Sequence, residues 1–266
     1  MTNLLDPDAS GKALSFDHAV IIISDLEEAI ANFNSLGFDV QRGGTTGPVH
    51  NALIYFRDGT YIELTTPVSR WFRALFRLLY SVGALGLAAK YRPTVMARFL
   101  LWFGGPSGLR DWCVRCVNMD KTIELLRAQG IETCDAEYFS RKRPDGEVAE
   151  WRLAGPTDRR LPFMIEDISP TEVRVPFQDA SEHPNGVIGI SAVVLQRDSG
   201  LKVLETLKRC VAVETTGNEA CTLGSVTIRL ADNQSAPRLA LELRSSGEVK
   251  GPLPAGKTSG SLIVLV

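Results

Sequence analysis

Residues 16–40, FDHAVIIISDLEEAIANFNSLGFDV, decide the fold. The first eight form an apolar, β-rich run, and either Ser24 or Asp25 can then cap a helix. Two glutamates fall in the first helical turn, where the helix dipole favours acids, and Gly37 is typical of the residue that ends a helix. The stretch therefore predicts one strand followed by one short helix.

Three strand-like runs follow this helix: FDVQR at 38–42, HNALIYF at 50–56 and YIELTT at 61–66. The last two are separated by Asp58-Gly59, and an Asp-Gly pair between two β-rich runs is a hairpin signal. The predicted order is therefore strand, helix and three strands.

The same order recurs between residues 111 and 168. DWCVRCV starts the second copy, Gly130 closes its helix, and strands flank a turn at 144–146 before the last strand, LPFMIEDI. Placing Gly37 on Gly130 gives an offset of 93 (130 − 37). That offset puts Asp111 at the position of His18. Glu166 matches Glu63 by its place within the last strand.

We therefore predict an α+β chain of repeated βαβββ modules with a helical insertion. Two modules should pair into a cup, and a third, weaker module with an extra C-terminal strand should cap it. The expected boundaries are 14–66 for the first module, 67–106 for the insertion, 107–170 for the second module, 171–186 for a linker, and 187–266 for the third module.

The composition of the chain limits the class of protein that we expect. The chain has 266 residues, 44% of them apolar and 23% charged, as in an ordinary globular protein, and a net charge of −2, which would not gather nucleic acid. Residues 1–16 lack a basic region followed by an apolar core, so we expect no signal peptide and a cytoplasmic protein. We accordingly expect the five cysteines to be reduced.

Three short motifs, DH in the first strand, HNA in the third and IEL in the fourth, together with the repeat, resemble the vicinal-oxygen-chelate superfamily, in its glyoxalase-like branch. The resemblance implies a cup whose first and last strands supply metal ligands, here His18, Glu63, Asp111 and Glu166. It also implies a divalent ion (Mn, Fe, Zn, Ni or Mg), with no other cofactor expected. A lyase, isomerase or dioxygenase acting on a small molecule would follow, with Glu166 and Glu63 as candidate catalytic groups.

The chain departs from the family pattern at Asp111, where a histidine or a longer side chain is usual. His50 could replace it, because His18, His50 and Glu63 would make a two-histidine, one-carboxylate set. The same residues could instead orient a ligand in a metal-free pocket, or have structural roles only. Arg115 either binds an anionic substrate group or forms a salt bridge to Asp111 or Glu166.

The insertion is basic and aromatic. Residues 71–90 and 94–103 each predict a helix, and no acid occurs between Glu63 and Asp111. We consider three roles: a lid over the cup, in which Trp71 and Phe72 touch an apolar substrate; a homodimer surface; and contact of residues 70–104 with an anionic membrane surface. Cationic residues interrupt the apolar runs well short of the ~20 residues needed to cross a bilayer.

Overall fold

The computed structural model describes residues 14–46, 49–143, 146–175, 182–210, 214–215, 217–233 and 235–266. Residues 1–13, most of the segment in which we expect no signal peptide, lie outside these ranges. So do the first two residues of the turn expected at 144–146.

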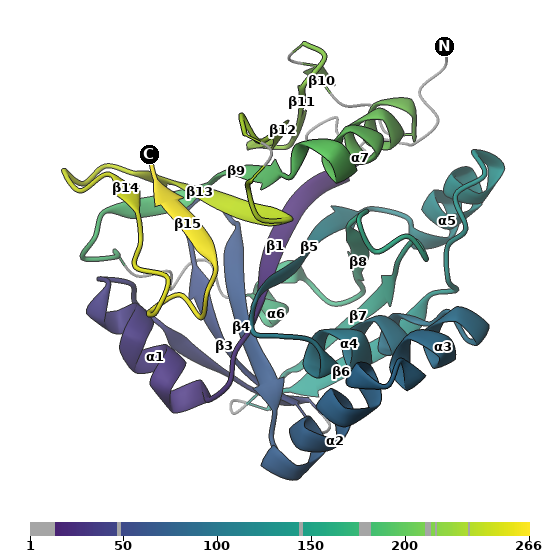
Figure 1. The fold of residues 1–266 in the computed structure, drawn as a ribbon, viewed down its shortest axis with the longest axis horizontal. Helices are drawn as coiled ribbons and strands as arrows, with labels where there is room; N and C mark the ends of the chain where they lie inside the picture. The colour runs from purple at the N-terminus through teal and green to yellow at the C-terminus, as the bar shows by residue number, and fades with distance from the viewer. Residues whose placement is uncertain are drawn as a thin grey trace.

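The first two modules have the predicted order and form one eight-stranded sheet (Figure 1). The first contains β1 (Leu14–Ile22), α1 (Leu26–Ser35), β2 (Gln41–Thr46), β3 (Val49–Tyr55) and β4 (Tyr61–Pro67). The second contains β5 (Gly108–Cys116), α5 (Met119–Ala128), β6 (Glu137–Lys142), β7 (Val148–Ala154) and β8 (Phe163–Asp167). The strand order is β2-β3-β4-β1-β5-β8-β7-β6, and the antiparallel β1–β5 pair joins the modules. The predicted fold class is confirmed.

Local signals account for the first helix. The Asp25 carboxylate accepts hydrogen bonds from the backbone N–H groups of Glu27 and Glu28, at 3.0 and 3.1 Å. Gly37 then turns the chain with φ +81°. A side chain there would also press on Asn185, because a Cβ atom would lie 2.9 Å from the Asn185 Cβ. The glycine thus both ends α1 and lets the segment before the third module pack closely.

The insertion forms three helices instead of the two predicted: α2 (Arg70–Ser81), α3 (Ala84–Tyr91) and α4 (Val95–Gly104). The first predicted helix breaks at Gly83, whose φ of +77° leaves the helical region, and α2 and α3 meet at 81°. No single helix in the described part of the chain is long and apolar enough to cross a membrane; α2 and α3 meet that criterion only when taken together.

The third module pairs with further strands instead of standing alone. After the short α6 (Thr171–Arg174) come β9 (Val187–Leu195), α7 (Arg197–Cys210), β10 (Glu214–Thr215), β11 (Ala220–Leu223), β12 (Val226–Leu230), β13 (Leu239–Ser245), β14 (Gly251–Pro252) and β15 (Leu262–Leu265). The seven strands form a second sheet in the order β10-β11-β12-β9-β13-β15-β14. This order repeats that of the first sheet up to its seventh strand. The strands from β13 onward therefore act as a fourth, helix-free module, which we had not predicted.

The hairpin at Asp58-Gly59 docks the first module onto β9. Asp58 Oδ1 accepts hydrogen bonds from the Thr60 backbone N–H at 3.0 Å and from the Thr60 hydroxyl at 2.6 Å. The same hydroxyl oxygen accepts the backbone N–H of Ile190 at 3.2 Å. Gly189 has no side chain, and the Asp58 carboxylate occupies the place where a Cβ atom would stand. A side chain at residue 189 would therefore displace the Asp58 carboxylate from this position between the two sheets.

Substituting Gly189→Ala should lower the free energy of unfolding by about 1–3 kcal/mol, because the Asp58 carboxylate must leave its bonds to Thr60. Gly86→Ala is the matched control, since a Cβ atom there meets no other atom within 4 Å and lies in the interior of α3. The control should leave stability unchanged or raise it by up to about 1 kcal/mol. Urea denaturation measures both variants, and equal effects would contradict this account of the interface.

Candidate functional site

A pocket of about 200 Å³ lies over the first sheet, between its strands and the helices of the insertion. Strands β1, β3, β4, β6, β7 and β8 contribute to its wall, as do α2, α4 and the end of α6. Its lining residues are His18, Val49, Asn51, Leu53, Tyr61, Glu63, Thr65, Pro67, Phe76, Met96, Phe99, Leu100, Trp102, Phe103, Phe139, Arg141, Trp151, Leu153, Phe163, Ile165, Arg174 and Val175. Both modules therefore build one pocket.

The insertion covers this pocket with apolar side chains. Phe76 of α2 and five residues of α4 line it. Trp71 and Phe72, which we predicted to touch the substrate, do not; their side chains are 68% and 41% exposed. Because residues four apart share a helical face, the pocket contact falls on Phe76, one turn after Phe72. The lid interpretation thus fits the pocket, but through different residues.

Asp111 holds this lid and is not in the pocket. Its carboxylate accepts hydrogen bonds from Arg98 Nε at 2.6 Å, from Arg98 Nη2 at 2.8 Å and from Trp102 Nε1 at 2.9 Å. Asp111 and Arg98 are both buried. Arg98 and Trp102 share one face of α4, so the pair clamps that helix against β5. The family-implied ligand position thus has a structural role here.

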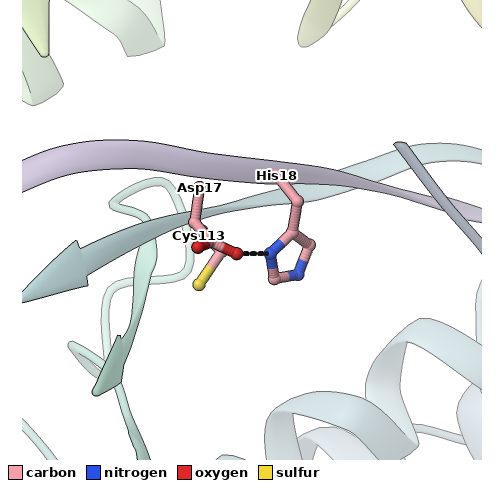
Figure 2. Close-up of side chains that lie close together, drawn as sticks. All are labelled: Asp17, His18 and Cys113. Carbon is pink, nitrogen blue, oxygen red and sulfur yellow. Dashed lines mark hydrogen bonds and ion pairs between the residues drawn. The ribbon is translucent and has the colours of Figure 1, made fainter. Parts of the chain in front are cut away.

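His18 is the central polar group of the pocket. Its ring stacks on Tyr61, with centroids 4.5 Å apart, and meets the edge of Phe163 at 5.4 Å. Its Nδ1 lies 2.6 Å from Asp17 Oδ1. Figure 2 shows the side chains of Asp17 and His18 on the same side of β1.

A β-bulge explains why these two neighbours point the same way. The register of β1 against β5 runs from Phe16↔Val114 directly to His18↔Cys113, so Asp17 is the extra residue. In a regular strand, successive side chains point to opposite faces. The bulge removes that alternation here and brings Asp17 to the Nδ1 atom of His18.

Asp17 is fully buried and surrounded by cations. Arg115 donates to its Oδ2 at 2.6 Å, and Arg174, from α6, donates to the same oxygen at 3.1 Å. Burial raises the pKa of the Asp17 carboxyl, but Arg174 and the hydrogen bond from His18 outweigh this and hold that pKa well below its usual value. Asp17 is therefore a carboxylate, so it accepts the His18 Nδ1–H and directs Nε2 away from itself.

Glu63 lies on the other side of the His18 ring. Its Oε2 is 3.7 Å from His18 Nε2, and its Oε1 accepts a hydrogen bond from Asn51 Nδ2 at 2.7 Å. The predicted association of His18 with Glu63 is therefore present. Among the described lining residues these two are the only histidine or carboxylate side chains.

The other predicted site residues lie outside the pocket lining. On β8, Phe163 and Ile165 face the pocket, so alternation turns Glu166 away. Glu166 accepts the backbone N–H of Met119, at the start of α5, and pairs with Arg152 at 3.2 Å.

His50 and Arg115 are placed elsewhere for comparable reasons. Val49, Asn51 and Leu53 line the pocket from β3, so strand alternation turns His50 to the opposite side of the sheet. Arg115 forms a salt bridge, as one of our two interpretations held, but with Asp17 instead of Asp111 or Glu166.

One cluster in the described part of the chain brings three potential metal ligands together. Asp17, His18 and Cys113 each offer one ligand atom, and these atoms lie within 4.8 Å of one another (Figure 2). Two of the three already have partners, because Asp17 binds Arg115 and Arg174, and His18 Nδ1 binds Asp17. Burial raises the pKa of the Cys113 thiol well above its usual value.

The residues that line the pocket do not supply a full set of metal ligands either. A catalytic zinc site takes three protein ligands, and the two-histidine, one-carboxylate iron site also needs three. His18 Nε2 and Glu63 offer two, and the described lining from the second module adds no histidine or carboxylate; it consists of Phe139, Arg141, Trp151, Leu153, Phe163 and Ile165. The described residues therefore do not fit a tightly bound catalytic ion.

Three polar residues of this site were missed or undervalued from the sequence. Asp17 is adjacent to His18, but only the bulge makes it a partner. Arg174 lies in the segment that we had assigned to a linker; its Nη1 donates to the Tyr61 hydroxyl at 2.7 Å. Arg141, on β6, also lines the pocket.

A second hollow, of about 280 Å³, lies between α3, α4 and the loops around Cys134 and Gly155. Its buried charged residue is Arg98, which Asp111 already pairs. Because that charge is already paired, this hollow is a weaker candidate site than the pocket that contains His18.

Known proteins resemble this chain in fold. A sequence model described as a glyoxalase-like domain matches residues 16–211. A hypothetical protein from Staphylococcus aureus superposes with a TM-score of 0.68 at 13% identity, covering 95% of this chain and 98% of that one. The Mn(II)-bound glyoxalase from Novosphingobium aromaticivorans superposes with a TM-score of 0.50 at 10% identity, covering 96% and 82%. At these identities the structures show the fold alone. No curated protein matches the sequence.

Substituting Asp17→Asn should lower the free energy of unfolding by about 1.5–3 kcal/mol, because Arg174 would lose one of its two buried carboxylate partners and keep only Asp167. The folded-state pKa of Asp17 is depressed, so its stabilisation is complete above its unfolded pKa of about 4 and is lost as the pH falls below it. Wild type should therefore lose more stability than the variant on acidification, as urea denaturation at each pH would measure.

Glu27→Gln is the control for this substitution, because it removes a carboxylate from the exposed Glu27–Arg42 pair. It should change the free energy of unfolding by no more than about 1 kcal/mol. If Asp17→Asn were equally mild, the buried network would not have the role assigned to it.

Proposed function

This chain belongs to the glyoxalase-like domain family, and we propose that its pocket binds a small, largely apolar organic molecule without a resident metal ion. The observation that carries the proposal is the asymmetry of the lining: the first module supplies His18 and Glu63, whereas the second supplies aromatic and aliphatic side chains and one cation, Arg141, but no histidine or carboxylate among the described residues. A pocket with apolar walls and a few convergent polar groups is typical of small-molecule sites.

The size and the lining indicate the class of ligand. A cavity of roughly 150 Å³ holds a benzene molecule, so about 200 Å³ suits one or two fused rings. Phe99, Trp102 and Phe163 offer ring faces or edges to such a body. His18 Nε2 and Glu63 lie where a hydroxyl or carbonyl oxygen of the ligand would find a hydrogen bond.

Arg141 adds a positive charge to the same wall. Its Nη2 donates to the backbone carbonyl of Arg174 at 3.1 Å, and its buried Nε has no hydrogen-bond partner among the described residues. An acidic substituent on the ligand would find its counter-charge there.

A second candidate function, catalysis of proton transfer, rests on the Asp17–His18 hydrogen bond. A carboxylate that accepts Nδ1–H orients the imidazole and stabilises its protonated form, which leaves Nε2 to accept a proton from a bound molecule. The reaction would then start at an acidic C–H or O–H group held beside Nε2. Glu63 would sit on the same side as a second acid–base group.

The purified, tag-free protein should contain well under one equivalent of Mn, Fe, Zn or Ni by plasma mass spectrometry, also after incubation with each ion, because the pocket presents two ligand residues. Near-stoichiometric metal that disappears in His18→Ala would overturn the proposal. It would support instead the metal-dependent lyase, isomerase or dioxygenase that the family resemblance implied.

Binding of 2-naphthol and naphthalene tests the pocket itself. Wild type should bind 2-naphthol about tenfold more tightly, which corresponds to one added hydrogen bond. His18→Ala should abolish that preference, whereas Glu166→Gln, outside the lining, should keep it. Calorimetric titration measures the affinity of each of the three proteins for both ligands. No preference in wild type, or an equal loss in Glu166→Gln, would contradict the placement of the polar end.

A further inference from the structure

The outer surface of α2 and α3 carries large apolar side chains that nothing in the described chain covers. Trp71, Leu78, Val82, Leu87 and Tyr91 are between 59% and 75% exposed. No residue of α2 is buried, and only Leu85 is buried in α3. Clustered exposure of this kind marks an interaction surface.

The spacing places these side chains in stripes. Trp71, Leu78 and Val82 are seven and four residues apart, and Leu87 and Tyr91 are four apart, so each set lies along one helical face. The stripes are separate from the pocket, because the lining contains Phe76 and residues of α4 but none of these five.

The same surface is positively charged. The chain has no aspartate or glutamate from residue 64 to residue 110. Arg70, Arg77, Lys90 and Arg92 are exposed beside the apolar stripes. Within the described part of the chain, one of these four has an acidic partner: Arg70 lies 3.5 Å from Asp25. The whole molecule nevertheless has a net charge of −2, so the positive charge is local.

We propose that the α2–α3 surface docks on an anionic lipid bilayer. Tryptophan and tyrosine side chains favour the boundary between headgroups and acyl chains, and arginine and lysine attract anionic headgroups. Because α2 and α3 are short and meet at 81°, each lies along the bilayer surface instead of crossing it.

A second copy of the chain fits this surface less well. A two-fold interface brings the same patch of each copy together. Here it would bring the basic residues of both copies, Arg77 and Arg92 among them, into one interface with no acid from residues 64–110 to balance them. Like charges at the centre of an interface oppose association, whereas an anionic bilayer complements them.

Docking would also bring the pocket close to lipid. Phe72 stacks on Phe76, a lining residue, with ring centroids 6.2 Å apart, and Met96 both lines the pocket and is 43% exposed. A lipid-dissolved apolar molecule would then be the natural ligand. This last step alone rests on the proposed function of the pocket; docking does not.

Vesicle sedimentation tests the docking. The full chain should pellet with vesicles of phosphatidylcholine and phosphatidylglycerol, and much less with phosphatidylcholine alone. Arg77→Gln and Arg92→Gln should each weaken binding about fivefold, as expected for one surface cation. Trp71→Ser combined with Leu78→Ser should reduce it further and should remove the blue shift of tryptophan emission on vesicle addition.

Matched controls lie on α7, where Leu201→Ser and Arg209→Gln remove an exposed apolar and an exposed basic residue. Both α7 variants should leave vesicle binding unchanged. His18→Ala should also leave it unchanged, so that a loss of ligand binding in the pocket can be told apart from a loss of vesicle binding. Circular dichroism checks that each variant is folded.

Three results would overturn the proposal: equal pelleting with both vesicle types, equal losses in the α7 controls, or a dimer in sedimentation velocity that Trp71→Ser with Leu78→Ser dissociates. The last would assign the surface to a second copy of this chain.

Discussion

The buried charge of Asp17 is the constraint on which the site depends. A carboxylate with no exposed surface is stable only if enough positive charge and hydrogen bonds replace the water that it has lost. Arg174 and Arg115 supply that charge, and His18 supplies a hydrogen bond. These partners come from α6, β5 and β1, so one carboxylate ties three parts of the chain together. His18 is oriented toward the pocket as a direct consequence.

A second buried ion pair holds in place the wall of the pocket that α4 forms. Arg98 and Asp111 fix α4 against β5, and Trp102 shares the same carboxylate. The lid is thus anchored through polar contacts on one face, while Phe99, Trp102 and Phe103 meet the pocket. The family resemblance implied a metal ligand at Asp111, whereas in this structure its carboxylate binds Arg98 and Trp102.

The two modules can share one strand order and still place different side chains in the pocket, because strand pairing depends mainly on the backbone. Both sheets use the same order of pairing, which depends on backbone hydrogen bonds and apolar alternation. The polar groups of the pocket are concentrated in the first module, whereas Phe163 and Ile165 occupy the facing wall. The C-terminal sheet repeats this pairing around the antiparallel β9–β13 pair, although its second half, β13 to β15, contains no helix.

The sequence by itself determined the order of elements in the first two modules, because caps, helix-ending glycines and periodicity are local signals. It also pointed to His18 and Glu63, which the structure brings within 3.7 Å. Only the tertiary structure decided that Asp17 is the partner of His18, that Glu166 and His50 face away from the pocket, and that Asp111 binds Arg98. Each of these depends on strand register, on one bulge or on a contact between distant segments. Such features arise from pairing across the whole sheet, and no local pattern encodes them.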